Sequence, residues 1–402
     1  MASGTNIKKV DLTAVLHVCQ TLESILKNSF GPNGLSTLLS SASGNICISN
    51  DGVALMQSIR FESPMGRMIL DSIISHHRLT GDNSKSFVFI ISELLCKISN
   101  KLSLSEREND IFKLRDGFTR LSTVLQTTVM KEIEKHSIFY KENEIKEACR
   151  QLVKTSIADD VDRVSKFTGV LINTNVGDVN DLSIGVLASY ERIAIGTKMC
   201  VNLVPEHMVK VNQVVICAPS PGLVTEYVRA VGNAMKVLRM WTELWDLDGL
   251  HKADTCCHEY STDESASQPV STIQPRVFTT PGGGAAEFIV NKILNDYATR
   301  HRDNYYLALA ATLFAEAVLS IPRTLHQNSF VSKSRDNWIS TVTEASNNVS
   351  KGNGTISIDG KTGKLIDGFQ IGLVVSLNSK MRLFTDVLEL LQLLMKIDAI
   401  VI

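Results

Sequence analysis

Apolar side chains recur at helical spacing through most of the first third of the chain. Residues 11–30 follow the period of 3.6 residues, with Gly31-Pro32 as the stop. Pro64 begins another helix, which the polar cluster TGDN ends. The next helix begins near Ser84, and its body, FVFIISELLCKI, is apolar nearly all round, which predicts burial on several sides. An amphipathic stretch at 110–135 completes a mainly helical first region.

Strand-like runs are shorter and fewer. The sequence NICISN at 45–50 is a β-branched run that meets Asp51-Gly52, a dipeptide that tolerates the positive φ of a tight turn. Near the C-terminus, TISIDGKTGKLIDG (355–368) has the pattern of a hairpin, and the chain ends on a strand, IDAIVI. A helix behind Gly282–Gly284, two more helices and a last helix at about 379–396 surround these runs. A helical region therefore returns at the C-terminus.

The pattern between these two regions is mixed. A helix, three strand-like runs (FTGVLIN, LSIGVLAS and QVVICAP) and another helix from Leu223 predict a small α/β module. The following segment has few apolar side chains and many serines, threonines and charges, which predicts a flexible loop. The expected fold is mainly α (α+β), with four segments: helical 1–145, α/β 146–245, the loop 246–275 and helical 276–402.

Composition and charge exclude several classes of protein. The 402 residues are 44% hydrophobic and 21% charged, which is typical of globular chains, and the formal net charge is -1. No global field therefore favours nucleic acid or an anionic membrane. The longest apolar run, Leu307–Ile321, contains Glu316 and falls short of the ~20 residues that a bilayer span needs. The eight cysteines lack the spacing of a disulfide framework, and no secretory signal is expected, so these features favour the cytoplasm.

Three glycine-rich corners lie at the ends of predicted helices, at Gly31–Gly34, Gly81–Ser84 and Gly282–Gly284. The free backbone N–H groups and the helix dipole at such corners suit phosphate binding. For any one of them alone, simple turn chemistry is the favoured explanation. The sequence contains no G-x-x-x-x-G-K-[ST], and Gly360–Lys364 lacks that spacing and is predicted to form a hairpin turn.

Histidines offer two further candidate features. His251 and Cys256–His258 could in principle hold zinc, but adjacent cysteines are poorly spaced for tetrahedral coordination, and a solvated loop is favoured. His76 and His77 are expected on the exposed side of their helix. No arrangement of Ser, His and Asp supports a hydrolase.

Taken in order, the glycine corners are more specific than any of them separately. Phe30–Gly34, a strand, Asn50–Val53, a helix and Gly81-Asp82 resemble the L-G-P-x-G, N-D-G-A and G-D-G-T-T series of the group II chaperonins. The resemblance resumes downstream and covers about residues 10–165 and 208–402 in colinear order.

The downstream motifs complete the resemblance. Ala218–Met240 is similar to the family's second intermediate-domain helix, and Pro281–Ala285 to its V-P-G-G-G-A segment. Ile358–Asp367 is similar to its C-terminal nucleotide hairpin. The resemblance implies a helical equatorial domain formed by both chain ends, with a small α/β intermediate domain inserted. It also implies weak binding of ATP by these motif residues: Gly31, Pro32, Gly34, Asp51, Gly52, Gly81, Asp82, Ser84, Lys85, Gly282, Gly283, Gly284 and Asp359.

Several motif positions depart from the family pattern. Asn83–Lys85 replace a glycine and two threonines, so the resemblance leaves Asp82 alone as a ligand for Mg²⁺. Asn233 stands where active members carry the aspartate that orients the attacking water, and an amide cannot act as a general base. Ser357 and Val375-Ser376 replace the family's glycine and Glu-Pro. The resemblance therefore implies no catalytic residue.

The family's apical domain is expected between the two intermediate segments. A domain usually takes about 100 residues or more, and the interval from about Thr174 to Val211 is too short for one. Either this lineage or an incomplete gene model has lost most of the substrate-gripping module.

Within the family, the segments 61–89 and 381–402 resemble the chaperonin-like Bardet-Biedl syndrome proteins. This resemblance implies a chaperonin-like assembly chaperone for the ciliary coat complex called the BBSome, and so a role in ciliogenesis. Its partners would be chaperonin or chaperonin-like subunits and BBSome proteins, in the cytoplasm, at the ciliary base or at the centrosome. An ATP-hydrolysing chaperonin subunit and a structural scaffold that binds no nucleotide are the alternatives.

Overall fold

The computed structural model is mainly helical. It describes residues 7–9, 12–40, 46–102, 110–140, 144–156, 221–242, 278–329 and 335–401. The three strand-like runs of the predicted α/β module, the predicted loop 246–275 and the candidate zinc residues lie outside these ranges. The predicted domain boundaries therefore stay predictions.

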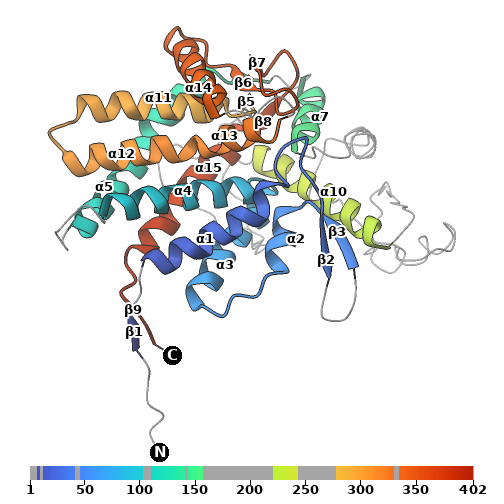
Figure 1. Cartoon of the computed structure of the whole chain (residues 1–402). Coiled ribbons are helices and arrows are strands. Elements are labelled where there is room, and N and C mark those ends of the chain that lie inside the picture. The colour runs from blue at the N-terminus through green and yellow to red at the C-terminus, as the bar shows by residue number, and fades with distance from the viewer. Residues whose placement is uncertain are drawn as a thin grey trace, which may run out of the picture.

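One hydrophobic core joins the two ends of the chain. Its buried residues run from Val15 to Ile133 and again from Ala286 to Met395. Figure 1 shows the main helices in successive layers, from α11 at the top through α12 and α4 to α1, and each helix contacts the next. The helices of the first part are α1 (Leu12–Lys27), α2 (Gly52–Gln57), α3 (Pro64–Thr80), α4 (Ser84–Leu102), α5 (Asp110–Val124), the π-helical η1 (Leu125–Val129) and α6 (Met130–Lys135). Those of the second part are α11 (Ala285–Arg300), α12 (Tyr305–Val318), α13 (Ser320–Gln327), α14 (Arg335–Ser350) and α15 (Leu377–Leu394).

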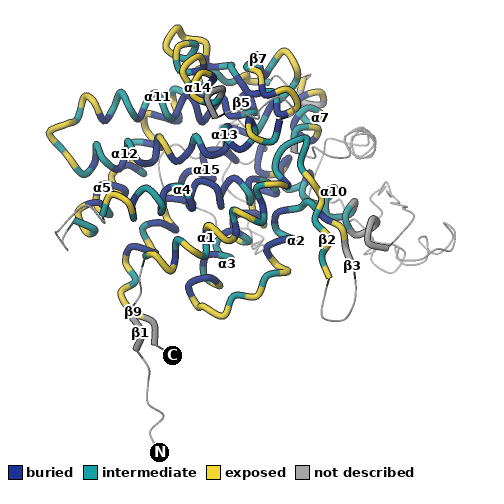
Figure 2. The backbone as a smooth tube through the Cα atoms, viewed as in Figure 1, coloured by how far each residue is buried: buried dark blue, intermediate teal, exposed yellow. Residues whose placement is uncertain are grey.

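Helix α4 lies at the centre of this core. Every residue from Ser86 to Ser92 is buried, because α4 contacts α1 on one side and α12 and α15 on others. Figure 2 shows α15 and the first part of α4 mostly in dark blue, and the last residues of α4 are less buried. The prediction of a helix buried on several sides is confirmed.

Helices α12 and α13 together are long and apolar enough to cross a membrane, by length and composition alone. In this structure most of the stretch Tyr305–Gln327 is buried inside the protein. Phe314, for example, is fully buried and packs edge to face against Phe384 of α15. The stretch is therefore accounted for as part of the core.

The strands form small antiparallel sheets at the margins of the helical core. The strand-like run predicted at 45–50 contains β3, which pairs with β2 in a hairpin, and near the termini β1 pairs with β9. The predicted C-terminal hairpin is β6 with β7, and β5 lies between β4 and β8 in a three-stranded sheet. The strand bounds are β1 (Ile7–Lys9), β2 (Thr37–Ser40), β3 (Ile46–Ser49), β4 (Ile138–Phe139), β5 (Phe278–Pro281), β6 (Ile356–Ile358), β7 (Leu365–Asp367), β8 (Val374–Ser376) and β9 (Ala399–Val401).

Two further helices, α7 (Ile145–Ser156) and α10 (Pro221–Thr242), pack on each other beside the main core. Small apolar clusters join them, and one of these includes Trp241, whose indole N–H donates to the carbonyl of Phe278 at 3.1 Å. Helix α10 also contacts α3, α15 and β3. It therefore lies against α3, which ends at the glycine corner Gly81–Ser84, and against β3, which precedes Asp51-Gly52.

Candidate nucleotide site

The first group of predicted site residues is held together through the backbone. We call the corner Gly31–Gly34, the β6–β7 hairpin and Gly282–Gly284 the backbone half of the site. The corner follows α1, and Gly31 has φ +87°, in the left-handed region. The amide of Asn33 donates to the carbonyls of Gly360 (3.1 Å) and Lys361 (3.3 Å) in the hairpin. A Cβ on Gly360 would lie 2.5 Å from Cδ of Pro32, so the corner and the hairpin are interlocked.

The glycines before α11 contact the other side of the same hairpin. The N–H of Ile358 donates to the carbonyl of Gly283 at 2.7 Å. Gly283 has φ +61°, and a Cβ there would lie 2.6 Å from the carbonyl oxygen of Ile358. Asp359, which was predicted to bind the nucleotide, accepts hydrogen bonds within the turn. The donors are Thr362 Oγ1 at 2.6 Å and the N–H of Lys361 at 3.0 Å. Three segments far apart in the sequence therefore meet in the backbone half, as the resemblance predicts.

The second group, the side-chain half, consists of Asp51, Gly52, the loop Gly81–Lys85, His77 and Asn233. Asp51 is the N-cap of α2, and its Oδ1 accepts from the N–H of Ala54 at 2.8 Å. The prediction of a positive φ at this dipeptide is wrong, because Asp51 is extended (φ -66°) and Gly52 begins a helix. Gly52 is required instead by a close approach, since a Cβ would lie 2.6 Å from Ser84 Oγ. The starts of α2 and α4 therefore touch.

The loop between α3 and α4 is shaped by two left-handed residues. Gly81 ends α3 at φ +72°, and Asn83 has φ +65°, unusual for a residue with a Cβ. Asp82 Oδ1 accepts from the N–H of Asn83 at 2.6 Å, and the buried amide of Asn83 donates to Ser379 Oγ at 2.8 Å. The substituted Asn83 thus anchors the loop to the N-terminus of α15.

Lys85 connects the two halves. Its side chain crosses the face of Gly52, where a Cβ would lie 2.8 Å from Lys85 Cγ. Its ammonium donates to the carbonyl of Ser29, at the beginning of the corner in the backbone half. A fixed positive charge therefore lies between the corner Gly31–Gly34 and the start of α4.

Asn233 of α10 lies between two polar side chains of the helical body. Its Nδ2 donates to Asp51 Oδ2 at 3.1 Å, and its Oδ1 is 3.1 Å from Nε2 of His77. Burial of the imidazole lowers the pKa of His77, although the charges of Asp51 and Asp82 act in the opposite direction. The position that the resemblance assigns to a catalytic aspartate is thus occupied by an amide with a partner on each side.

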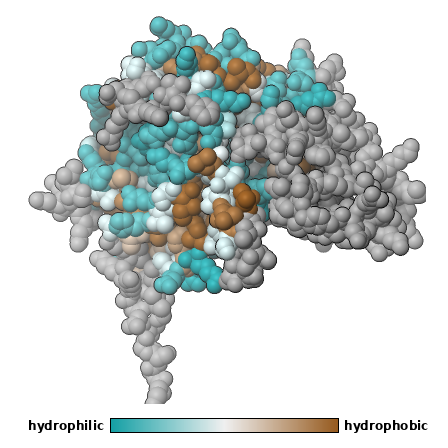
Figure 3. All heavy atoms as spheres, turned by 45° about the vertical axis from the view of Figure 1, so that its right-hand side comes forward, coloured by the Kyte–Doolittle hydropathy of each residue, from teal (hydrophilic) through white to brown (hydrophobic). Residues whose placement is uncertain are grey.

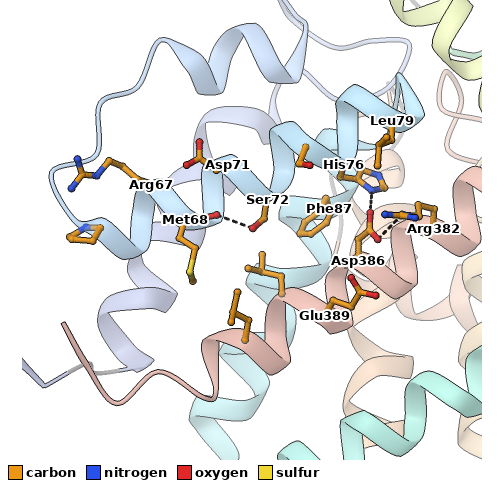
Figure 4. Close-up of a pocket in the computed structure, with 14 residues that line it drawn as sticks. Arg67, Met68, Asp71, Ser72, His76, Leu79, Phe87, Arg382, Asp386 and Glu389 are labelled. Atoms are coloured by element: carbon orange, nitrogen blue, oxygen red, sulfur yellow. Dashed lines mark hydrogen bonds and ion pairs between the residues drawn. The ribbon is translucent and has the colours of Figure 1, made fainter. Parts of the chain in front are cut away.

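The expectation that His76 and His77 are exposed is wrong. Their exposed fractions are 2% and 6%, because α10 covers one side of the end of α3 and α15 covers the other. His76 lies at a cavity of about 730 Å³ between α3 and α15, where its Nδ1 is 2.7 Å from Asp386 Oδ2 (Figure 4). Arg382 Nε lies 2.8 Å from the other oxygen of Asp386. None of the predicted nucleotide-binding residues lines this cavity.

A polar cluster beside Asp51 was missed by sequence reasoning. Ser49 Oγ donates to Glu226 Oε1 at 2.9 Å and accepts from the N–H of Asp51 at 3.0 Å. Arg229 pairs with Glu226 one helical turn along α10. Burial is the largest influence on the Glu226 carboxyl and raises its pKa. Only the i, i+3 spacing of Glu226 and Arg229 hinted at this cluster, and such spacing is common on exposed helix faces.

The described residues form no magnesium site by themselves. Mg²⁺ requires near-octahedral oxygen coordination, usually from one or two carboxylates together with phosphates. Within the described ranges, no three His, Cys, Asp or Glu side chains come together as ligands. Asp82 directs one oxygen to the N–H of Asn83. The predicted metal role of Asp82 therefore gains no support from the geometry.

The surface outside the site is partly apolar. Figure 3, turned to bring the right-hand side of Figure 1 forward, shows apolar residues grouped at the lower centre of that face. On the β2–β3 hairpin, Leu38 and Ile48 are directly opposed in register and are 62% and 55% exposed. Leu35, just before the hairpin, is 68% exposed. Exposed apolar pairs of this kind favour contact with another protein.

Comparison with known proteins adds the following findings. Residues 22–160 and 266–402 match the model of the TCP-1/cpn60 chaperonin family, which is well over half of the chain. Eighty-four residues, 21% of the chain, are 37% identical to the mouse BBSome complex assembly protein BBS10, of which they cover 12%. The human protein of that name is 32% identical over 110 residues, 27% of this chain and 14% of its own length. The thermosome subunit alpha of Aeropyrum pernix is 26% identical over 163 residues, 39% of this chain and 26% of its own length.

The aligned segments thus span only about an eighth to a quarter of the relatives' own lengths. Similarity to BBS10 agrees with the resemblance of residues 61–89 and 381–402 to the chaperonin-like Bardet-Biedl syndrome proteins.

Proposed function

The chain belongs to the TCP-1/cpn60 chaperonin family, and on that premise we propose that it is a chaperonin-like assembly chaperone with a degenerate ATP site. Its function in this proposal is to hold other proteins during assembly rather than to run a cycle of ATP hydrolysis.

The observation that carries the proposal is the environment of Asn233. A general base must accept a proton from the attacking water, and a carboxamide has no atom basic enough to do so. Both polar atoms of this amide also have partners, because Nδ2 donates to Asp51 and Oδ1 faces His77. The geometry therefore supports a site that no longer activates water.

Weak nucleotide binding remains part of the proposal. Backbone N–H groups in the glycine corner after α1 and at the starts of α4 and α11 are suited to phosphate oxygens, and ATP would supply those oxygens when bound. We assign the contacts to the three glycine corners, at Gly31–Gly34, Gly81–Lys85 and Gly282–Gly284. Lys85 would neutralise phosphate charge as a point charge in place of a metal ion.

The proposed client follows from the relatives. BBS10 is named as a BBSome complex assembly protein, and this chain is similar to it over part of its length. We propose that this chain likewise assists BBSome assembly and ciliogenesis, together with chaperonin or chaperonin-like subunits. Its proposed location is the cytoplasm, including the ciliary base or centrosome.

Purification of the tagged chain from ciliated cells, followed by identification of the co-eluting chains, tests the assembly role. Recovery of chaperonin subunits and BBSome proteins is the expected result. An isolated monomer would contradict it.

Phosphate release by the purified chain separates the proposal from the alternative of an ATP-hydrolysing subunit. We expect steady-state hydrolysis to be absent or marginal. General-base catalysis contributes about 10²- to 10⁴-fold, but Asn233→Asp should raise activity only if the loop Gly81–Lys85 still positions ATP. A wild-type turnover equal to that of ordinary chaperonins would contradict the proposal.

A further inference from the structure

Asn233 joins three elements that are distant in the sequence. It lies on α10, its partner Asp51 caps α2, and its partner His77 is in the last turn of α3. The two hydrogen bonds span 182 and 156 residues along the chain. A single side chain therefore connects α10 to two parts of the helical body.

The chemistry of the partners fixes the orientation of the amide. An ionised carboxylate only accepts hydrogen bonds, so Asp51 must face the Nδ2 of Asn233. Oδ1 then faces His77, which must donate from Nε2. The other ring nitrogen, Nδ1, is buried and has no hydrogen-bond partner among the described residues. Among the similarly shaped side chains of Asn, Asp and Leu, only the amide of Asn donates from one terminal atom and accepts at the other when the carboxyl group of Asp is ionised.

The packing beneath the amide is equally close. A Cβ on Gly81 would collide with the backbone carbonyl of Asn233 and lie 2.6 Å from Cβ of Lys236. Near the C-terminal end of α10, the side-chain amide of Asn378 donates to the carbonyl of Met240 at 3.3 Å. Helix α10 is thus fastened near its middle and near its end by contacts that are made entirely within the protein.

We propose that Asn233 is a positioning residue that fastens α10 to the N-cap of α2 and to the last turn of α3, and that it holds the helix in this position without nucleotide. The position that the resemblance associates with water activation has become a structural bridge. This inference goes beyond the proposed function, because it holds whether or not the chain binds ATP or assembles other proteins.

Hydrogen exchange of the α10 amides in the full chain tests the proposal. Asn233→Asp keeps the shape of the side chain but cannot donate to Asp51, and it places two carboxylates side by side. Loss of a hydrogen bond to a charged group predicts roughly tenfold faster exchange in α10 at about pH 8, where an imidazole is neutral. Saturating ATP should leave the wild-type rates in α10 within about twofold, since the proposed contacts exist without ligand.

A matched control is Asn291→Asp on α11. Asn291 is also partly buried, and its amide donates to the carbonyl of Ala315 at 2.7 Å, so this variant makes the same chemical change away from α10. It should leave α10 exchange unchanged. Asn233→Leu removes both hydrogen bonds without adding a charge and should accelerate α10 exchange in the same direction as Asn233→Asp.

Three outcomes would overturn the proposal. In the first outcome, the α10 amides of the wild type already exchange as fast as those of the Asn233 variants. In the second, the α10 amides of both Asn233 variants exchange no faster than those of Asn291→Asp. ATP could also slow wild-type α10 exchange by about tenfold or more, which would show that the ligand and not the amide holds the helix. If Asn233→Asp fails to fold, the Asn233→Leu variant and the wild-type measurement with ATP still decide the question.

Discussion

The two halves of the candidate site are built from different kinds of contact. In the backbone half, Gly283, Gly360 and the corner Gly31–Gly34 interlock through carbonyls, N–H groups and the space that a Cβ would fill. In the side-chain half, Asp51, Asn233 and their neighbours are connected through carboxylate, amide and imidazole groups. Glycine contacts do not depend on the chemistry performed at a site, whereas side-chain contacts do. In the proposed function, the chain therefore keeps the backbone framework of a nucleotide site, although Asn233 has a structural role at the position of the family's catalytic aspartate.

The strongest test of the backbone half is Gly283→Ala. A left-handed backbone costs a residue with a Cβ roughly 1–2 kcal/mol, and the collision with the Ile358 carbonyl raises the expected loss to about 3–4 kcal/mol. Urea unfolding measures the loss. Gly352→Ala is the control, because Gly352 also has a positive φ (+85°) but nothing lies within 4 Å of its Cβ position. Equal losses for the two variants would show that the interlock contributes nothing.

The next test asks whether the chain contacts other chaperonin subunits through strands β1 and β9. β9 pairs with β1, and among the described residues each of these two strands has one edge without a neighbour. We expect deletion of residues 399–402 to release co-purifying chaperonin subunits while circular dichroism stays unchanged, because the core ends at Met395. Ile339→Ser, at a 67% exposed position on α14, should keep every partner. A truncated, folded chain that also keeps every partner would exclude these strands as the interface.

The side-chain half makes a different prediction for nucleotide. Calorimetry should show weak ATP binding that Mg²⁺ changes little, because the ammonium of Lys85 already lies beside the corner. Lys85→Met removes a charged donor and should weaken binding roughly tenfold. Lys131→Met, on the exposed face of α6, should leave the affinity unchanged. A strict requirement for Mg²⁺ would contradict the assigned role of Lys85.

The smallest expected effect is a change in how stability depends on pH. The pKa of His77 is lowered in the folded protein from its usual 6.5, mainly by burial. The unfolded chain therefore binds a proton at a higher pH than the folded one, so stability is lost as pH falls below 6.5. His77→Gln keeps a donor for Asn233 but does not titrate, and it should flatten this loss in thermal unfolding between about pH 7 and 5.

The histidine at position 326 provides a comparison. Burial lowers its pKa too, but it lies away from Asp51 and Asn233. If His326→Gln flattens the curve and His77→Gln does not, the imidazole beside Asn233 is not buried as the structure has it.

Periodicity predicted the helices well because their burial follows from their own sequence. The start of α3 at Pro64, the buried α4 and the β6–β7 hairpin agree with the predicted segments. Near the C-terminus three helices, α12, α13 and α14, lie where two were expected, because Leu319 interrupts an apolar run that looks continuous. Short strands such as β5 and β8 were not predicted, since each is only three or four residues long and is defined by its partners.

Sequence motifs indicated the glycine corners of the candidate site, because glycine motifs specify local backbone conformation. They did not indicate the contacts between side chains that are distant in the sequence. Two of the glycine corners that the sequence singled out, Gly31–Gly34 and Gly282–Gly284, contact the β6–β7 hairpin in the structure. His77 is buried because α10 covers it, and the contact residue Asn233 lies 156 residues further along the sequence. No pattern in the sequence around His77 predicts this burial. The use of Gly52 for close approach, rather than for a turn, also depends on a distant neighbour, Ser84.

The construction of one core from both ends of the chain has a consequence for biosynthesis. As the polypeptide leaves the ribosome, α4 (Ser84–Leu102) emerges long before α15 (Leu377–Leu394), which covers part of it. Domains that depend on such distant contacts fold slowly and expose apolar surface while they wait. Until α15 is made, the nascent chain must therefore carry an apolar helix that is only partly covered. A protein proposed to assist the assembly of others would itself benefit from chaperones during synthesis, and a premature stop before residue 377 would leave part of α4 uncovered.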